Sequence, residues 1–146
     1  MKTYPITLTV NGQTSSLEVP ADRSLVELLK DDLHHKSVKT GCYIGECGAC
    51  TVILNGKPVN ACLVLAVEAD GAVIETAEAE MTDLGVLSAL QQAFVDFGAI
   101  QCGYCTPGML TSARALLAKD PHPSREAIVE AVAGNFCRCT GYEPII

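Results

Sequence analysis

The stretch GCYIGECGACTVILNGKPVNAC, residues 41–62, decides how the first half of the chain folds. Its first three cysteines follow the spacing Cys-x4-Cys-x2-Cys, and a fourth follows after eleven intervening residues. Three thiolates from one loop, with a fourth from further along the chain, form the ligand pattern of a plant-type [2Fe–2S] site. The predicted ligands are Cys42, Cys47, Cys50 and Cys62.

Glycines in the same stretch support this interpretation. Gly41, Gly45 and Gly48 allow a positive φ and let backbone N–H groups approach the sulfur atoms. Such hydrogen bonds help to set the reduction potential of a cluster. Structural zinc more often uses paired Cys-x2–4-Cys knuckles, so the spacing favours a cluster over zinc here. A Rieske centre needs two histidine ligands, and no histidine neighbours these cysteines in a suitable motif. We interpret the histidines as ordinary solvated residues: His34, His35 and His122.

A second set of cysteines lies in QCGYCTPGML, residues 101–110, and GNFCRCTGY, residues 134–142. Its spacing is Cys-x2-Cys, then 31 residues, then Cys-x-Cys. This spacing alone leaves zinc open. A helix that starts near Thr106 would favour negative charge at its N-terminus, but zinc thiolates would benefit as much as a cluster. The candidate metal ligands of this set are Cys102, Cys105, Cys137 and Cys139.

The hydrophobic pattern changes along the chain and predicts two domains, residues 1–76 and 77–146, in an α+β fold. Two hairpins are expected about Asn11-Gly12 and Asn55-Gly56, with a last strand in residues 71–78. Between the hairpins, Ser24 and Glu27 form a capping box in front of a helix. The linker between the halves is expected around residues 76–83.

Helices dominate the prediction for the second half. The first carries an apolar face with Leu87, Leu90, Phe94 and Phe97, and Gly98 is its expected stop. The second is expected to have Thr106 as its N-cap and Pro107 as its first residue. The third is expected to be capped by Ser124 and to bury its apolar side chains, Ile128, Val129 and Val132.

Composition excludes several classes of function. The 146 residues carry a net charge of −7 with no block of Lys or Arg, which argues against a nucleic-acid partner. No apolar run approaches the roughly 18 residues that span a bilayer, and the N-terminal MKTYPITLTVNGQ does not resemble an export signal. We therefore expect the cytoplasm, where disulfides are rare and clustered thiols indicate metal or redox chemistry. A hydrophobic content of 49% indicates a core plus a partner-facing surface.

The three motifs GCYIGECGACTV, QCGYCTPGM and GNFCRCTGY, in this order, closely resemble the small iron–sulfur subunit of molybdenum hydroxylases. This is the xanthine dehydrogenase, aldehyde oxidase and carbon-monoxide dehydrogenase family, and the resemblance covers nearly the whole chain. It implies a plant-ferredoxin-like β-grasp domain followed by a helical bundle. It also implies that the second set of cysteines holds a second [2Fe–2S] cluster.

The resemblance implies further contacts and partners. Gln101 is expected to hydrogen-bond the pterin of a molybdopterin cofactor, with Cys139 between that pterin and the second cluster. The implied partners are a large molybdopterin-binding subunit and a medium subunit that binds FAD. Electrons would pass from the large subunit through both clusters to FAD or another acceptor, after hydroxylation of a purine or another N-heterocycle. The chain alone should be inactive.

Two other functions remain open at this level. A free-standing two-cluster ferredoxin would use the same cysteines but would be a monomeric carrier. A zinc-binding interaction module would contain zinc and no acid-labile sulfide. The apolar surplus and the motif around Gln101 favour the subunit over the carrier.

Overall fold

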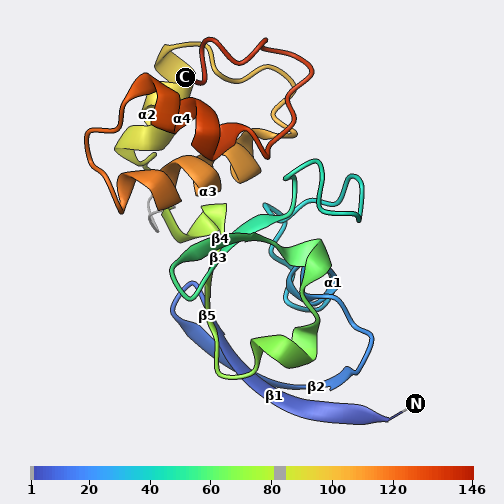
Figure 1. Ribbon diagram of the computed structural model, residues 1–146. Coiled ribbons are helices and arrows are strands. Elements are labelled where there is room, and N and C mark those ends of the chain that lie inside the picture. The colour runs from blue at the N-terminus through green and yellow to red at the C-terminus, as the bar shows by residue number, and fades with distance from the viewer. Residues whose placement is uncertain (1, 81–84) are drawn as a thin grey trace.

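Two hairpins and a single strand build one five-stranded sheet in the first half of the chain. The computed structural model describes residues 2–80 and 85–146. The sheet order is β2-β1-β5-β3-β4; β1 pairs with β5 in parallel, and the other pairs are antiparallel. The strands are β1 (Thr3–Val10), β2 (Gln13–Pro20), β3 (Thr51–Leu54), β4 (Lys57–Asn60) and β5 (Val73–Glu75). Figure 1 shows this half below the helical half.

Both predicted hairpins are confirmed, because each turn has the residues that its backbone requires. Asn11 and Gly12 adopt φ of 49° and 83°, and Asn55 and Gly56 adopt 48° and 79°. Two successive positive φ values define the turn that matches the twist of paired strands, and Asn-Gly adopts it at little cost. The hairpin about Asn55 brings the chain back so that Cys62 returns to the loop that contains Cys50.

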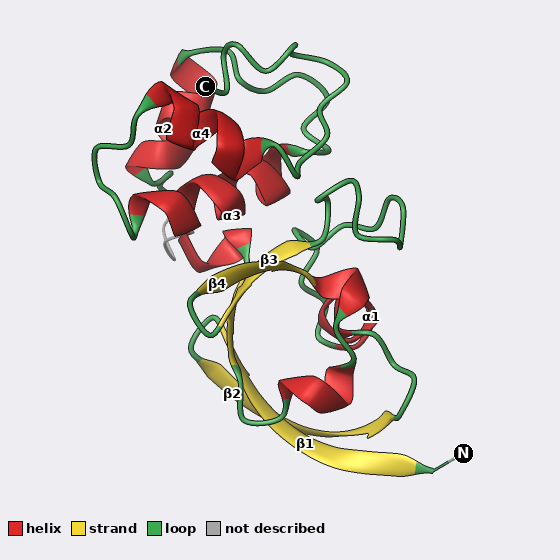
Figure 2. Ribbon diagram, in the orientation of Figure 1, coloured by secondary structure: helices red, strands yellow, loops and turns green. Residues whose placement is uncertain are grey.

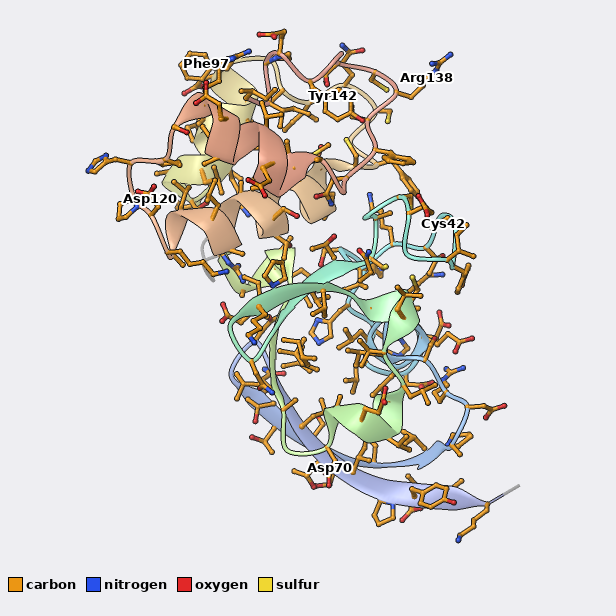
Figure 3. The ribbon with its side chains drawn as sticks, viewed as in Figure 1. Cys42, Asp70, Phe97, Asp120, Arg138 and Tyr142 are labelled. Carbon is orange, nitrogen blue, oxygen red and sulfur yellow. The ribbon has the colours of Figure 1, made fainter. Side chains whose placement is uncertain are left out.

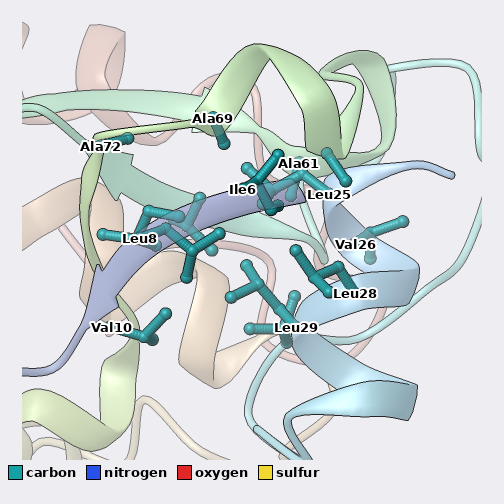
Figure 4. Close-up of a cluster of buried hydrophobic side chains, with 14 of the residues drawn as sticks. Ile6, Leu8, Val10, Leu25, Val26, Leu28, Leu29, Ala61, Ala69 and Ala72 are labelled. Atoms are coloured by element: carbon teal, nitrogen blue, oxygen red, sulfur yellow. The ribbon is translucent and has the colours of Figure 1, made fainter. Parts of the chain in front are cut away.

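A short helical segment packs inside the curved sheet (Figure 2). It begins as α1 (Leu25–Glu27) and continues as one π-helical turn, Leu28–Asp32. The predicted capping box is confirmed: the Glu27 N–H donates to the Ser24 hydroxyl, and the Ser24 N–H donates to the Glu27 carboxylate. Apolar side chains of β1 and of this segment pack with others from the rest of the first half in the main core, part of which is shown in Figure 4.

The last strand is shorter than predicted. It ends at Glu75 because the next backbone N–H, that of Thr76, donates to the Asn11 side chain instead of to a neighbouring strand. The chain then forms a 3-10 turn over Ala77–Glu80. The predicted linker, residues 76–83, therefore begins as ordered structure, and residues 81–83 lie outside the described residues.

In the described part of the second half, the chain forms three α-helices: α2 (Ala89–Asp96), α3 (Thr106–Leu117) and α4 (Arg125–Val132). Gly98 ends α2 as predicted. It has a φ of 68°, its N–H donates to Val95, and the Ala99 N–H donates to Phe94, which is a Schellman motif. Ser124 caps α4 as predicted.

Three details of the helical prediction are wrong. The apolar side chains of α4 are not all buried, because Val132 is 2% exposed but Val129 is 44% exposed. Cys105, not Thr106, is the N-cap of α3, so the helix begins one residue earlier and Thr106 is its first residue. The apolar face of α2 is only partly buried: Phe94 is 5% exposed, whereas Phe97 is 76% exposed. Phe97 follows the last helical residue and points away from the small core that Phe94, Met109 and Val132 share.

The structure combines one mixed sheet with helices, so the predicted α+β fold class is confirmed. Within residues 2–80 and 85–146, no helix has both the length and the apolar character needed to cross a membrane.

Candidate metal centres

The loop after Thr40 wraps around the Cys42 thiol. Backbone N–H groups of Ile44, Glu46 and Cys47 point at its sulfur, with N–S distances of 3.5, 3.3 and 3.4 Å. Positive φ values at Tyr43 and Gly45, 58° and 79°, give the loop this curvature. These backbone hydrogen bonds lower the pKa of Cys42 to about 6. The loop is therefore built to hold a sulfur with negative charge.

Cys50 and Cys62 meet at the inner side of the same loop. Cys50 is 3% exposed, and burial raises the pKa of its thiol to about 12, with the adjacent Cys62 and Cys47 adding to the effect. The Asn60 side chain donates to the Gly45 carbonyl at 2.8 Å, which ties the end of the second hairpin to the loop. The structure thus brings together all four cysteines predicted for the first set. Cys42 is adjacent to Cys47, and Cys50 is adjacent to Cys62.

The second set converges in the same two-by-two way. Cys102 lies against Cys139, and Cys105 lies against Cys137. Burial raises the pKa of Cys105 to about 12. Burial also acts to raise the pKa of Cys137, but hydrogen bonds from Thr140 outweigh it and lower that pKa to about 7.

The segment after Cys137 is held in place by a tyrosine. The Cys137 N–H donates to the Tyr142 hydroxyl at 2.8 Å, and the Cys137 sulfur lies 3.1 Å from the Thr140 hydroxyl. The Tyr142 N–H in turn donates to the Thr140 hydroxyl at 3.1 Å. Sequence reasoning missed this role of Tyr142, although its position three residues after the last cysteine was the available signal.

The donor sets are compatible with a two-iron centre. Zinc requires four donors around one point. A [2Fe–2S] cluster is held by four thiolates spread over two irons. Each set has two adjacent pairs of thiols, and one pair for each iron is the arrangement that a [2Fe–2S] cluster needs.

The two sets are joined by buried polar contacts. The Asn135 side chain is 3% exposed and donates to the Gly48 carbonyl at 3.0 Å and to the Thr51 hydroxyl at 3.1 Å. Its oxygen accepts a hydrogen bond from the Ser112 hydroxyl at 2.7 Å. One residue further on, the Phe136 N–H donates to the Cys47 carbonyl at 2.9 Å. Asn135 therefore locks the first loop against the second.

Glycines allow this approach. A Cβ on Gly108, in the first turn of α3, would collide with the Gly48 carbonyl oxygen. A Cβ on Gly48 would collide with the Gly134 carbonyl and with Asn135. Sequence reasoning assigned Gly48 to loop curvature, which its φ of 68° agrees with, but gave no role to Gly108 or Asn135.

Other predicted residues lie at the surface. Gln101 is exposed, as are its neighbour Cys102 and the more distant Cys139. Arg138 is exposed as well, and Figure 3 shows its side chain extending away from the molecule. The side of the second set that contains Cys102 and Cys139 is therefore exposed at the protein surface.

The prediction of a solvated histidine is wrong for His35. Its imidazole is half-buried and lies 2.7 Å from the Glu78 carboxylate, which also accepts the Ser37 N–H at 2.7 Å. Burial acts to raise the pKa of Glu78, but these hydrogen bonds outweigh it and hold that pKa below its ordinary value. The contact fastens the 3-10 turn after β5 to the first half.

Comparisons with known protein families agree with both sets. Residues 8–82 match the family described as 2Fe-2S iron-sulfur cluster binding domain. Residues 74–146 match the family described as [2Fe-2S] binding domain.

Similar proteins are found along the whole length of the chain. It is 51% identical to the nicotinate dehydrogenase small FeS subunit of Eubacterium barkeri, over 97% of this chain and 90% of that protein. It is 45% identical to the xanthine dehydrogenase iron-sulfur-binding subunit of Escherichia coli O157:H7, over 99% and 91%. A chain of quinoline 2-oxidoreductase from Pseudomonas putida 86 superposes with a TM-score of 0.94 at 42% identity, covering 99% of this chain and 89% of that one.

Proposed function

Because the chain belongs to the small iron–sulfur subunits of the xanthine dehydrogenase and aldehyde oxidoreductase family, we propose that it carries electrons through two [2Fe–2S] centres, one in each half. Its role in that family is electron transfer within a molybdenum hydroxylase, an oxidoreductase assembled with larger subunits. The observation that carries the two-centre proposal is the convergence of four thiols, as two adjacent pairs, in each half.

The proposed ligands follow the pairing of the thiols. Cys42 with Cys47 and Cys50 with Cys62 would hold the two irons of the N-terminal centre. Cys102 with Cys139 and Cys105 with Cys137 would hold those of the C-terminal centre. When bound, such a centre accepts and releases one electron at a time. Zinc at the second set loses its support, because residues 74–146 match a [2Fe-2S] binding domain.

The chain's own groups prepare these positions. Backbone N–H groups aimed at Cys42 stabilise negative charge on its sulfur, and such hydrogen bonds tune the potential of a bound centre. Tyr142 and Thr140 fix the backbone and sulfur of Cys137. The protein thus contributes position and electrostatics, while the bound centres supply the redox chemistry.

We assign the outer edge of the C-terminal centre to the large subunit. Gln101 and Cys139 are exposed there, which leaves the Gln101 amide accessible to a pterin and Cys139 between that pterin and the centre. Electrons would enter at this edge and leave near the exposed Tyr43 and Ile44 of the first loop, toward a flavin subunit or another acceptor. The domain boundary at residues 76 and 77, the β-grasp architecture and the cytoplasmic location belong to the same proposal.

The proposed substrate class is an N-heterocycle or purine. Its support is that the relatives and the structure cited above are named for nicotinate, xanthine and quinoline. Hydroxylation itself would take place on the large subunit, so this chain would receive only the electrons.

Native purification tests the whole proposal. The chain should co-purify with a larger subunit identified by mass spectrometry, and iron and acid-labile sulfide should correspond to two [2Fe–2S] centres per chain. Electron paramagnetic resonance (EPR) of the reduced complex should show two distinct signals. A monomeric chain without partners would support a free-standing carrier instead, and a colourless chain with zinc and no sulfide would overturn both iron–sulfur functions.

A further inference from the structure

Lys39 crosses from the first half of the molecule to the second cysteine loop. Its backbone N–H donates to the Ala49 carbonyl at 3.1 Å, which anchors the residue beside the first loop. Its ammonium nitrogen lies 3.5 Å from the Gly103 carbonyl oxygen, between Cys102 and Cys105. A half-buried cation therefore lies against the four-residue segment, 102–105, that supplies two of the proposed ligands.

An aromatic ring holds this ammonium in place. The Lys39 nitrogen lies 5.1 Å from the centre of the Tyr104 ring, within the range of a cation–π interaction. The Tyr104 hydroxyl donates to the Thr40 carbonyl at 2.7 Å, so the ring is fixed to the residue that follows Lys39. The Lys39 ammonium contacts the Gly103 carbonyl and the Tyr104 ring, and its backbone N–H bonds to Ala49. These three contacts give the lysine a defined position.

The charge of Lys39 forms no ion pair with any of the residues at 2–80 and 85–146. Among the residues that the structure describes, no carboxylate lies within 4.0 Å of its nitrogen, whereas the nearby Lys30 lies 3.8 Å from Asp31. The chain as a whole carries a charge of −7, so most of its charged side chains are acidic, and a half-buried cation without a carboxylate partner among the described residues is unusual in it. Exposed Arg138 is closer in sequence to the ligands, but water screens an exposed charge more strongly.

A [2Fe–2S] centre held by four thiolates is anionic, and its negative charge grows by one when it takes up an electron. No bond forms or breaks and no proton is required in that step. A fixed cation nearby stabilises the reduced form more than the oxidised form, because the attraction scales with the charge of the centre. Such a cation raises the reduction potential.

We propose that Lys39 is an electrostatic positioning residue that raises the reduction potential of the C-terminal centre relative to the N-terminal one. The inference rests on the proposed function, because it requires a centre at Cys102, Cys105, Cys137 and Cys139. Its consequence is that the C-terminal centre accepts electrons readily from the large subunit. The Lys39 ammonium bonds to the second cysteine loop at Gly103, whereas its bond to the first loop, at Ala49, comes from the backbone N–H, so we expect the N-terminal centre to be affected less.

Potentiometry followed by EPR tests this in the full chain with both centres bound, in complex with its partners. Lys39→Gln should lower the midpoint potential of the C-terminal centre, with a change in its reduction equilibrium on the order of tenfold, or about 59 mV for one electron. Lys39→Arg keeps the charge and the ring contact and should restore most of the wild-type potential. Lys36→Gln removes the same charge from an exposed position nearby and should change neither centre.

The results separate the inference from the function beneath it. Two wild-type EPR signals with no shift in Lys39→Gln beyond that in Lys36→Gln would overturn the inference and leave the proposed function standing. An equal shift in Lys39→Arg and Lys39→Gln would also overturn it, because lost packing rather than lost charge would be the cause. Absence of the C-terminal signal in the wild-type complex would overturn both.

Discussion

The backbone N–H of Phe136 donates to the carbonyl oxygen of Cys47 at 2.9 Å, and this one hydrogen bond joins a residue of the first cysteine set to the neighbour of Cys137 in the second. It is a short bonded connection between two proposed ligands that lie 90 positions apart in the sequence, at 47 and 137. Because it uses only backbone atoms, its presence depends on the fold rather than on the side chain at position 136.

Replacing Phe136 by proline should slow electron transfer between the two centres. Proline has no N–H and cannot make the bond to Cys47. Phe136→Ala keeps the N–H and removes an exposed ring, so it serves as the matched control. Rapid-freeze EPR after partial reduction should show a several-fold slower equilibration in Phe136→Pro alone. Equal rates in both variants would exclude this bond as a significant route.

Each cysteine set should fail independently. Cys62→Ser should abolish the EPR signal of the N-terminal centre and leave that of the C-terminal centre, because the thiols that lie against one another belong to the same set. Cys137→Ser should have the opposite effect. EPR and visible spectra of the reduced variants measure this, and loss of both signals from either substitution would contradict two separate sites.

Gly108→Ala should destabilise the protein even though alanine favours helices. The added methyl group would collide with the Gly48 carbonyl, a backbone atom that cannot move without shifting the first loop. We expect a loss of about 1–3 kcal/mol in the free energy of unfolding, the usual cost of overpacking. Urea denaturation measures it.

Gly134→Ala is the control for that substitution. A Cβ at Gly134 meets no atom within 4 Å, and its φ is not positive. This variant should therefore be as stable as the wild type or slightly more stable. A loss of stability in Gly134→Ala as large as that in Gly108→Ala would contradict the steric explanation.

Stability should fall in acid through Glu78. Its pKa is lowered in the folded protein, so its contribution is complete above the ordinary value of 4.5 and is lost as the pH falls below that value, through the folded pKa. Glu78→Gln should flatten this part of the profile and lower stability near neutral pH. Thermal unfolding between pH 3 and pH 7 measures both effects. An unchanged acid limb in Glu78→Gln would assign the loss to other carboxylates.

Sequence patterns predicted the local structure well where one residue pair determines it. Asn-Gly dipeptides placed both hairpins, the Ser24–Glu27 pair placed the first helix, and Gly98 placed the end of α2, because each acts on the backbone next to it. The start of α3 was misplaced by one residue, since its N-cap, Cys105, makes no side-chain capping bond that would identify it in the sequence.

Contacts between the halves could not be predicted in the same way. Asn135 satisfies atoms at positions 48, 51 and 112, and nothing in a single sequence indicates which distant carbonyl a buried amide will meet. His35 looked like a surface residue because its partner, Glu78, lies 43 positions away. The first cysteine set was predicted from its spacing, which is a local pattern, and the second set from the family resemblance, whereas Lys39 and Tyr104 come together only in the folded protein.

The contact between Gly48 and Gly108 also limits how the protein can be taken apart. An expression clone cut at the proposed domain boundary, between residues 76 and 77, would remove the Asn135 side-chain donor from the Gly48 carbonyl and would uncover the first turn of α3. Each fragment would then expose backbone groups and apolar surface that the other fragment normally covers. Chimeras that exchange one half with a relative should keep a glycine at both positions and an asparagine at position 135, or the grafted surfaces will not close.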